Sequence, residues 1–320
     1  MSGGGDSLAL LLIAAGWART CGRSVIALTV DHGLRPEAAA EARFVADVAA
    51  RYGIAHRTLR WQAPEPGQAK ARAARHQLLA AAAREAGSVL ILTAHTEDDQ
   101  AETFLIRARA GSGWYGLAGI QPLSLSPAET QGVPVFLARP LLSTPRAALR
   151  HLLRANGQDW IEDPSNDNPA YERVRMRRLL AADSALRARV LAIQGRLQLL
   201  RQVQDRALAR WLSDAVELRP DGTLRAPLPL PSGERGERAL AAMISLASTR
   251  TRPVRSDALA RLAHRIARPD TLRPATLGGA AIRIRNGNLK AAAEHPLPPE
   301  QVNAIPARLS AMVTACSGEM

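Results

Sequence analysis

Apolar residues in the first 110 positions fall into short β-branched runs that alternate with longer stretches of helical spacing. Ser24 to Val30 and Ser88 to Ala94 are mostly apolar, which is typical of strands buried on both faces of a sheet. His56 to Trp61 is a weaker candidate strand. Helices are expected over residues 8–19, 36–51, 68–86 and 97–109. This alternation predicts an α/β fold with a parallel, Rossmann-like sheet and helices on both faces.

The pattern changes after residue 110. A glycine-rich loop is expected to Leu125, and Thr144-Pro145 begins a helix that continues to Ala155. A smaller, mostly helical C-terminal region follows the irregular residues 159–170, with a hairpin turn at Asn286-Gly287. Its expected parts are long helices over 172–212, a linker or loop over 219–237, helices over 237–246 and 256–267, and a hairpin over 280–290. The tail after Pro296 carries no clear pattern.

The segment Ser2-Gly3-Gly4-Gly5-Asp6-Ser7 runs directly into the first expected helix. Glycines let the backbone approach an anion closely, and the free amides of a helix N-terminus point at that anion. The serine hydroxyls add donors. Asp6 beside a phosphate requires a bridging cation, which predicts a nucleotide site with magnesium held at Asp6. The alternative is an ordinary polar tail before a helix.

A phosphate loop of this kind needs a strand in front of it to aim the turn. Only Met1 precedes Ser2. A first strand is therefore lacking either because the start of the chain is assigned too late or because the chain is truncated, and we expect a late start.

A second candidate follows the strand that ends at Ala94. The segment His95-Thr96-Glu97-Asp98-Asp99-Gln100-Ala101-Glu102 holds four acids within six positions. On a helix, Asp98 or Asp99 shares a face with Glu102, and such paired carboxylates can bind magnesium or an ammonium group. Acids that merely favour a helix N-terminus are the structural alternative.

Weaker candidates lie nearby. Val30-Asp31-His32-Gly33-Leu34-Arg35 follows a strand and suits a nucleotide pocket, although an ordinary turn explains it equally well. Arg72 and Arg75 lie on a helix whose end approaches the same sheet edge. Gly111-Ser112-Gly113 is either a second anion nest or a flexible loop.

The net charge is +13, which favours a polyanionic partner such as RNA or DNA. Between Arg139 and Arg210 there are 14 arginines, no lysines and seven acids. The segment Asp163 to Asp167, followed by Arg173, Arg175 and Arg177, is the second unusual stretch of the chain. Aromatic residues make up only 3%, so base-stacking platforms are not expected.

Two distant cysteines, Cys21 and Cys316, form neither a metal-ligand spacing nor a redox pair, which favours a cytoplasmic protein. The sequence shows no signal peptide and no apolar run of membrane-spanning length, so no membrane partner is expected.

Several of these strings together resemble one family. SGGGDS, VDHGLRPEA, AHTEDDQAET, GSGWYGLAGI, RPLL with Arg146, and WIEDPSNDNPAYERVRMR occur in the order and spacing of the bacterial tRNA(Ile)-lysidine synthetases, which are N-type ATP pyrophosphatases of the PP-loop superfamily. The resemblance is strong over roughly residues 2–180. The chain departs from the family pattern at Thr96, at Ala110 and within Arg173 to Arg177.

The resemblance implies that ATP adenylates carbon 2 of the wobble cytidine in tRNA(Ile) with the CAU anticodon and releases pyrophosphate. Free L-lysine then displaces AMP and forms lysidine. It also implies a PP-loop catalytic domain over residues 1–180 and an Arg-rich helical, tRNA-orienting region over 181–320. The oligomeric state stays open, with a homodimer as one option.

The resemblance also implies residue roles. Ser2, Gly3, Gly4, Gly5, Asp6 and Ser7 bind ATP with Arg75, and Asp6 holds magnesium. Asp99 and Glu102 hold the lysine, so that Asp6, Arg75, Asp99 and Glu102 are the catalytic set. Arg173 and Arg175 bind substrate, and which of Arg173, Arg175 and Arg177 contacts ATP or tRNA is left open.

Three alternative functions fit the sequence less well. A tRNA thiolase of the same loop class needs active-site cysteines, which Cys21 and Cys316 do not supply. An amidotransferase needs a glutaminase nucleophile, and none is evident. A non-catalytic RNA-binding protein gains nothing from four carboxylates beside a phosphate loop.

Overall fold

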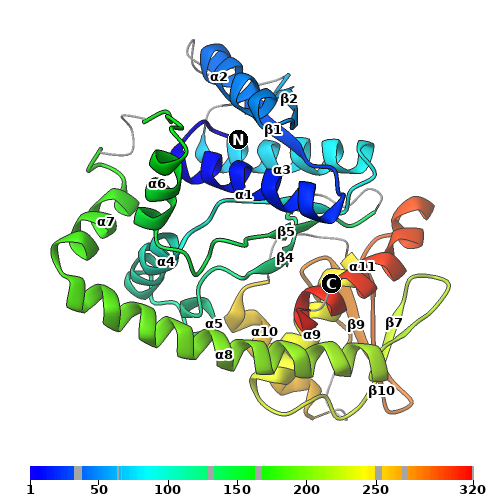
Figure 1. The fold of residues 1–320 in the computed structure, drawn as a ribbon. Helices are drawn as coiled ribbons and strands as arrows, with labels where there is room; N and C mark the ends of the chain where they lie inside the picture. Colours follow the sequence, from blue (N-terminus) through cyan, green and yellow to red (C-terminus); the bar gives the residue numbers. More distant parts are fainter. Residues whose placement is uncertain are drawn as a thin grey trace. The chain divides into compact units, whose positions relative to one another are not determined.

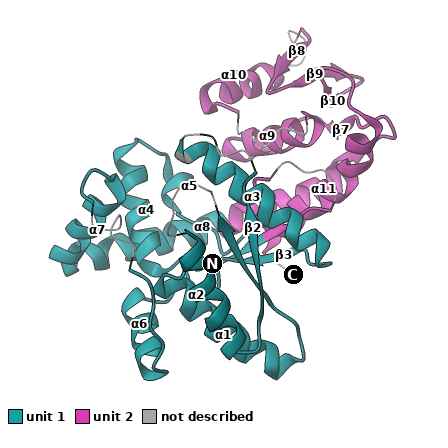
Figure 2. Cartoon of the chain, turned by 90° about the horizontal axis from the view of Figure 1, so that it is seen from above, with its two compact units in different colours: residues 1–124, 137–201 teal, residues 125–136, 202–320 magenta. Residues whose placement is uncertain are grey.

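The structure, a computed structural model, describes residues 1–31, 38–62, 65, 67–128, 133–162, 168–248, 254–268 and 273–318. The chain divides into two compact units, which Figure 2 colours separately. Unit 1 comprises residues 1–124 and 137–201, and unit 2 comprises residues 125–136 and 202–320.

Helices and strands alternate along unit 1 (Figure 1). Strand β1 pairs in parallel with β2, and Ile26 lies opposite Ala55. Strands β3, β5 and β4 form a second sheet in that order. The predicted α/β fold with parallel strand pairing is confirmed. The elements are α1 (Gly5–Cys21), β1 (Ile26–Asp31), α2 (Ala38–Arg51), β2 (Ala55–Arg60), α3 (Gln68–Glu85), β3 (Leu90–Leu92), α4 (Glu97–Arg109), α5 (Trp114–Leu117), β4 (Leu123–Leu125), β5 (Phe136–Ala138), α6 (Arg146–Ala155), α7 (Glu172–Ala182) and α8 (Ser184–Ala215), which continues into unit 2.

A core beneath the N-terminal loop fixes α1 in place. Leu8 of α1 is fully buried and belongs to one apolar cluster with Leu149 and Leu153 of α6. Helix α1 ends at Gly22, whose φ of 62° is a left-handed conformation that glycine adopts without strain. Packing along α1 therefore holds its N-terminus, and the glycine loop there, against α6.

Unit 2 is built on a five-stranded antiparallel sheet in the order β6-β7-β10-β9-β8. Its main apolar cluster joins inward side chains of this sheet, such as Leu224, Ile282 and Leu289, to Leu240 and Met243 of α9. The elements are β6 (Glu217–Leu218), β7 (Leu224–Pro227), α9 (Glu234–Ser248), α10 (Ser256–Ile266), β8 (Ala275–Leu277), β9 (Ala280–Arg285), β10 (Asn288–Ala293) and α11 (Pro299–Ser317).

Several local expectations change. The hairpin at Asn286-Gly287 is confirmed as the turn between β9 and β10, where both residues have positive φ. The expected linker over 219–237 is wrong in part, because it contains β7 and the start of α9. The tail after Pro296 forms α11, and the expected loop over 111–125 contains α5 and β4. No helix in the described ranges is both long and apolar enough to cross a lipid bilayer.

Candidate functional site

The glycine loop forms the start of α1. Gly4 is the N-cap residue, and Gly3 has a φ of +71°. A Cβ on Gly3 would lie 2.5 Å from the Ile161 side chain, so the loop cannot carry a side chain there without displacing Ile161. Ser7 Oγ donates to Gly4 O at 2.8 Å, and Ile161 N donates to Gly3 O at 2.9 Å. These hydrogen bonds hold the loop through its carbonyl oxygens, and the first-turn amides of α1 remain available for an anion.

Arg150 of α6 packs directly behind this loop. A Cβ on Gly5 would lie 1.2 Å from Arg150 Nη1, which is buried without a hydrogen-bond partner. The guanidinium lies over the Trp160 ring, 4.7 Å from its centroid. Sequence reasoning gave Arg150 no role, because a single arginine on an amphipathic helix carries no distinguishing signal.

The acidic segment forms the first turns of α4. Thr96 caps the helix: its hydroxyl accepts from Asp99 N at 3.4 Å, while Asp99 Oδ2 accepts from Thr96 N at 2.8 Å. This capping box fixes the orientation of the Asp99 side chain. Gln100 bonds both backbone groups of Ile120, at 2.8 Å and 2.7 Å, and so ties α4 to the following loop. Thr96 and Gln100 therefore have structural roles within the candidate site.

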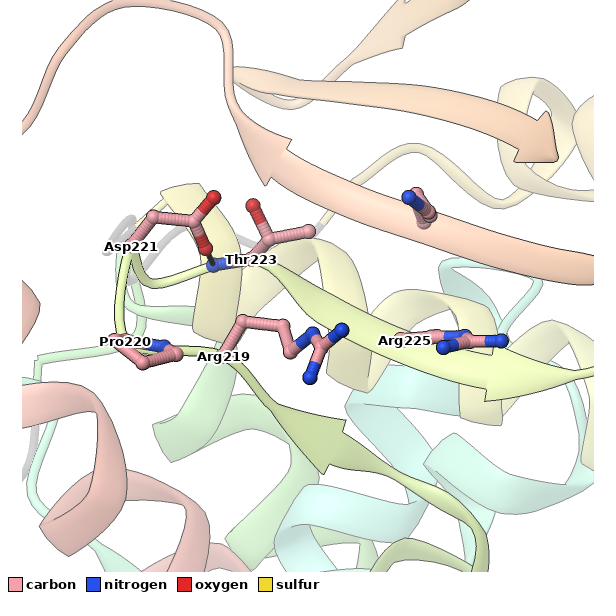
Figure 3. A pocket seen from close by; sticks show the side chains of 6 residues that line it. Arg219, Pro220, Asp221, Thr223 and Arg225 are labelled. Atoms are coloured by element: carbon pink, nitrogen blue, oxygen red, sulfur yellow. Dashed lines mark hydrogen bonds between the residues drawn. The ribbon is translucent and has the colours of Figure 1, made fainter.

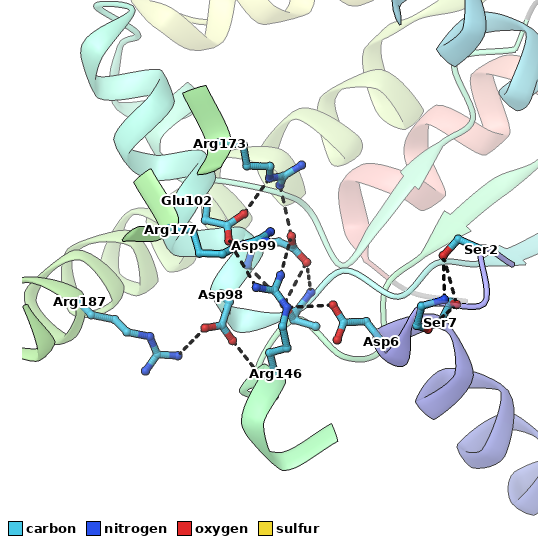
Figure 4. Close-up of polar contacts among 12 residues, drawn as sticks. Ser2, Asp6, Ser7, Asp98, Asp99, Glu102, Arg146, Arg173, Arg177 and Arg187 are labelled. Atoms are coloured by element: carbon cyan, nitrogen blue, oxygen red, sulfur yellow. Dashed lines mark hydrogen bonds and ion pairs between the residues drawn. The ribbon is translucent and has the colours of Figure 1, made fainter. Parts of the chain in front are cut away.

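Arg146, the first residue of α6, joins the glycine loop to the α4 carboxylates (Figure 4). Its guanidinium lies 3.0 Å from Asp6 Oδ2, 3.4 Å from Asp99 Oδ1 and 3.5 Å from Glu102 Oε1. Its backbone amide donates to Asp98 Oδ2 at 2.7 Å. Burial lowers the pKa of Arg146, but Asp6, Asp99 and Glu102 outweigh burial and raise it above its ordinary value. Three of the predicted site residues thus converge on one cation.

Glu102 is the most enclosed carboxylate of this group, with 1% of its side chain exposed. Arg173 Nε donates to its Oε2 at 2.8 Å, and Arg177 Nε donates to its Oε1 at 2.8 Å. Asp99 also faces Arg173, at 3.4 Å. Burial raises the pKa of Asp99, yet Arg173, the Thr96 backbone and Arg146 together hold it below its usual range. Asp99 is therefore a carboxylate at neutral pH.

The arginines of α7 divide by face. Arg173 and Arg177 are one helical turn apart and both reach Glu102. Arg175 lies between them in sequence, is exposed, and donates instead to Pro169 O at 2.8 Å and Ala170 O at 2.9 Å. The structure thus places Arg173 in the cluster and keeps Arg175 outside it.

Asp6 fits a cation ligand. Its Oδ2 accepts from Arg146, whereas its Oδ1 is buried and has no hydrogen-bond partner. A buried carboxylate oxygen without a donor suits a hard cation such as magnesium. No group of three or more His, Cys, Asp or Glu side chains in the described parts of the chain is arranged to hold a metal. Any metal at Asp6 would therefore take its other ligands from substrate or water.

A group of cations lies near the acidic cluster. Burial, together with the positive charges of Arg72, Arg75, Arg139 and His95, lowers the pKa of His76 to about 4. His76 Nδ1 and Arg139 Nε are buried without hydrogen-bond partners. Arg72, Arg75 and Arg139 therefore lie close enough to His76 and to one another that an anion bound among them would be stabilised.

The buried histidines His76 and His95 make the free energy of unfolding depend on pH. Burial also lowers the pKa of His95 to about 4, against the opposing charge of Asp99. In the unfolded chain both histidines take up protons near pH 6.5, whereas in the folded chain they do so only near pH 4. The urea unfolding midpoint is therefore expected to fall between pH 6.5 and 4. The variant His76→Gln/His95→Gln is expected to reduce this fall, whereas His264→Gln at an exposed position of α10 should leave it unchanged.

The weaker candidates from the sequence lie partly outside the described residues. His32 to Arg35 and Asp163 to Asp167 lie outside the described residues. Asp31 ends β1. Gly111, with a φ of +68°, follows Ala110, the C-cap residue of α4, and Gly113 caps the short helix α5, so this segment is a turn between helices.

Comparison with known proteins identifies a family and several relatives of this chain. Residues 1–183 match the PP-loop domain family. The tRNA(Ile)-lysidine synthase of Hyphomonas neptunium is 48% identical over 319 residues, covering 99% of this chain and 86% of that protein. The synthase of Methylobacterium nodulans is 39% identical, covering 92% and 89%. The synthase of Bradyrhizobium sp. is 42% identical, covering 74% and 64%. A solved U34-tRNA thiolase of Methanococcus maripaludis aligns with 15% identity and a TM-score of 0.48, covering 62% of this chain and 70% of that one.

Proposed function

Because the chain belongs to the tRNA(Ile)-lysidine synthase family of the PP-loop class, we propose that it ligates L-lysine to carbon 2 of the wobble cytidine in tRNA(Ile) with the CAU anticodon. The observation that carries this proposal is the Arg146 bridge, which links Asp6 of the glycine loop to Asp99 and Glu102 of α4. One site thereby offers a place for a triphosphate beside a place for an amine.

The first step forms the adenylate. The cytidine O2 atom attacks the α-phosphorus of ATP, the new P–O bond forms, and the bond to pyrophosphate breaks. Residues 2–7 hold the phosphates through backbone amides, and Arg75 with its neighbouring cations attracts the departing pyrophosphate. The buried Oδ1 atom of Asp6 could hold magnesium, which when bound would neutralise further phosphate charge.

The second step consumes lysine. Its ε-amine, after losing a proton, attacks carbon 2, and the C–O bond to AMP breaks. Asp99, whose pKa is held below its usual range, and the neighbouring Glu102 attract the ammonium form and place it beside the reacting carbon. Both carboxylates already face arginines, so the ammonium must replace one of them. Arg173 is the partner that yields, because 45% of its side chain is exposed, against 35% for Arg177 and 19% for Arg146.

The remaining assignments rest on the same family membership. Residues 1–180 form the catalytic domain, and the region after 180 orients the tRNA. Neither Cys21 nor Cys316 forms a disulfide in the described part of the chain, which supports a reducing cytoplasm as the location of the reaction.

Glu102→Gln tests the place of lysine. We expect the KM for lysine to rise at least tenfold, because the amide removes the charge that attracts the ammonium, while adenylation in the absence of lysine is retained. Steady-state kinetics at varied lysine measures the first effect, and pyrophosphate exchange measures the second.

The matched control is Glu97→Gln, at the first residue of the same helix. Glu97 contacts Arg187 at 3.2 Å, whereas it is Glu102 that contacts Arg146, at 3.5 Å. Its KM for lysine is expected to equal that of the unmodified protein. An unchanged KM in Glu102→Gln would remove Glu102 from the lysine site.

A further inference from the structure

Unit 2 carries a line of cations across its sheet. Glu217 of β6 lies opposite Arg225 of β7. Arg225 in turn lies opposite Lys290 of β10, and Lys290 lies opposite Arg283 of β9. Residues directly opposite one another in antiparallel strands project from the same face. Arg285 lies two residues beyond Arg283 and so projects from that face as well.

This basic face is the outer face of the sheet. The alternate residues Leu224, Ile282 and Leu289 are fully buried and pack in the cluster that includes α9. Arg283 and Arg285, by contrast, are exposed. The inner positions of β7, β9 and β10 are therefore apolar, whereas Arg225, Arg283, Arg285 and Lys290 occupy outer positions.

The outer face is hollowed between β6, β7 and β10 (Figure 3). A cavity of about 400 Å³ is lined by Arg219, Pro220, Asp221, Thr223, Arg225 and Lys290. The two carboxylates at this face are already engaged. Glu217 lies 2.9 Å from Arg219 and 3.7 Å from Arg225, and Asp221 accepts from Thr223 N at 2.9 Å within the turn.

The remaining cations have no such counterpart. Within the described part of the chain, Lys290 has no carboxylate at ion-pair distance. Like charges directly opposite each other in neighbouring strands destabilise a sheet. A bound polyanion would reverse that cost. The strands of this sheet contain no aromatic residue, so the face suits a sugar-phosphate backbone rather than stacked bases.

We propose that this outer face, defined by Arg219, Arg225, Arg283, Arg285 and Lys290, binds the phosphodiester backbone of the RNA substrate. The proposal rests on the proposed function for the identity of that RNA. The line from Arg225 to Arg283 spans two strand spacings, about 10 Å, which is more than a single free phosphate occupies. The outer positions hold no large apolar residue that would insert into a membrane.

The test compares two triple variants with the same change in charge. Arg283→Gln/Arg285→Gln/Lys290→Gln removes cations from the outer face. The control Arg235→Gln/Arg261→Gln/Arg265→Gln removes exposed arginines from α9 and α10. The affinity for CAU-anticodon tRNA is measured for each protein between 50 and 200 mM salt, about the range over which phosphate contacts lose most affinity.

We expect the outer-face variant to bind tRNA about tenfold more weakly at low salt. The slope of the logarithm of the binding constant against the logarithm of the salt concentration should be smaller in magnitude by about 2 to 3, because each phosphate contact contributes about one. The control should keep both values near those of the unmodified protein. Equal behaviour of the two variants would overturn the proposal, as would loss of binding to anionic phospholipid vesicles with tRNA binding intact. The binding assay needs no turnover. A lack of lysidine with the unmodified protein would therefore count against the proposed function alone.

Discussion

Replacing Arg146 by methionine is expected to lower the free energy of unfolding by about 3 kcal/mol and to abolish ligation. One guanidinium lies between Asp6, Asp99 and Glu102, whose side chains are 22%, 13% and 1% exposed. Without it, these carboxylates repel one another in a largely dry site. Urea denaturation measures the stability, and product formation measures the activity.

Two further variants sharpen this result. Arg154→Met changes an exposed arginine on the same helix and is expected to stay within about 0.5 kcal/mol of the unmodified protein. Arg146→Lys is expected to recover little, because an ammonium cannot bond three carboxylates in the fixed fork geometry of a guanidinium. An Arg146→Met protein of normal stability would mean that the bridge does not hold the carboxylates together.

Asp6→Asn is expected to reduce tRNA-dependent pyrophosphate exchange by about a hundredfold to a thousandfold. The amide keeps the size of the side chain and an oxygen for Arg146. It removes the charge at the buried Oδ1 atom, which has no partner in the protein and is the proposed magnesium ligand. The loss should therefore fall on the adenylation step rather than on folding.

Asp47→Asn, at an exposed position of α2, is the matched control and should leave exchange unchanged. The magnesium dependence provides a second readout, since Asp6→Asn is expected to need a higher magnesium concentration for half-maximal exchange. Exchange at the unmodified rate in Asp6→Asn would exclude Asp6 from the adenylation site.

Local pattern predicted most of unit 1. The β-branched runs identified β1 and β3, and the acids after Thr96 identified the start of α4. The two contacts of α7 with Glu102 also follow from helix geometry, because Arg173 and Arg177 are four residues apart and share a face. Arg175 points elsewhere for the same reason.

Long-range contacts were beyond such reasoning. Arg146 forms an ion pair with Asp6, which lies 140 positions away in the sequence, and no local pattern predicts that contact. In unit 2, β7 was missed because Pro227 and the nearby glycines are typical of loops, although an edge-proximal strand tolerates them. Helix α11 was missed because Pro306 lies inside it.

The central claim is that residues 2–7 and the α4 carboxylates form one site that uses ATP to join lysine to a cytidine. The most direct test incubates the protein with ATP, isotopically labelled lysine and tRNA of CAU anticodon, and analyses the nucleosides by mass spectrometry. The account predicts a labelled lysine–cytidine adduct that requires ATP and disappears in Asp6→Asn and Arg146→Met. The account would be contradicted if the cytidine stayed unmodified after incubation with ATP and lysine in excess. An adduct that formed equally in both variants would contradict it as well.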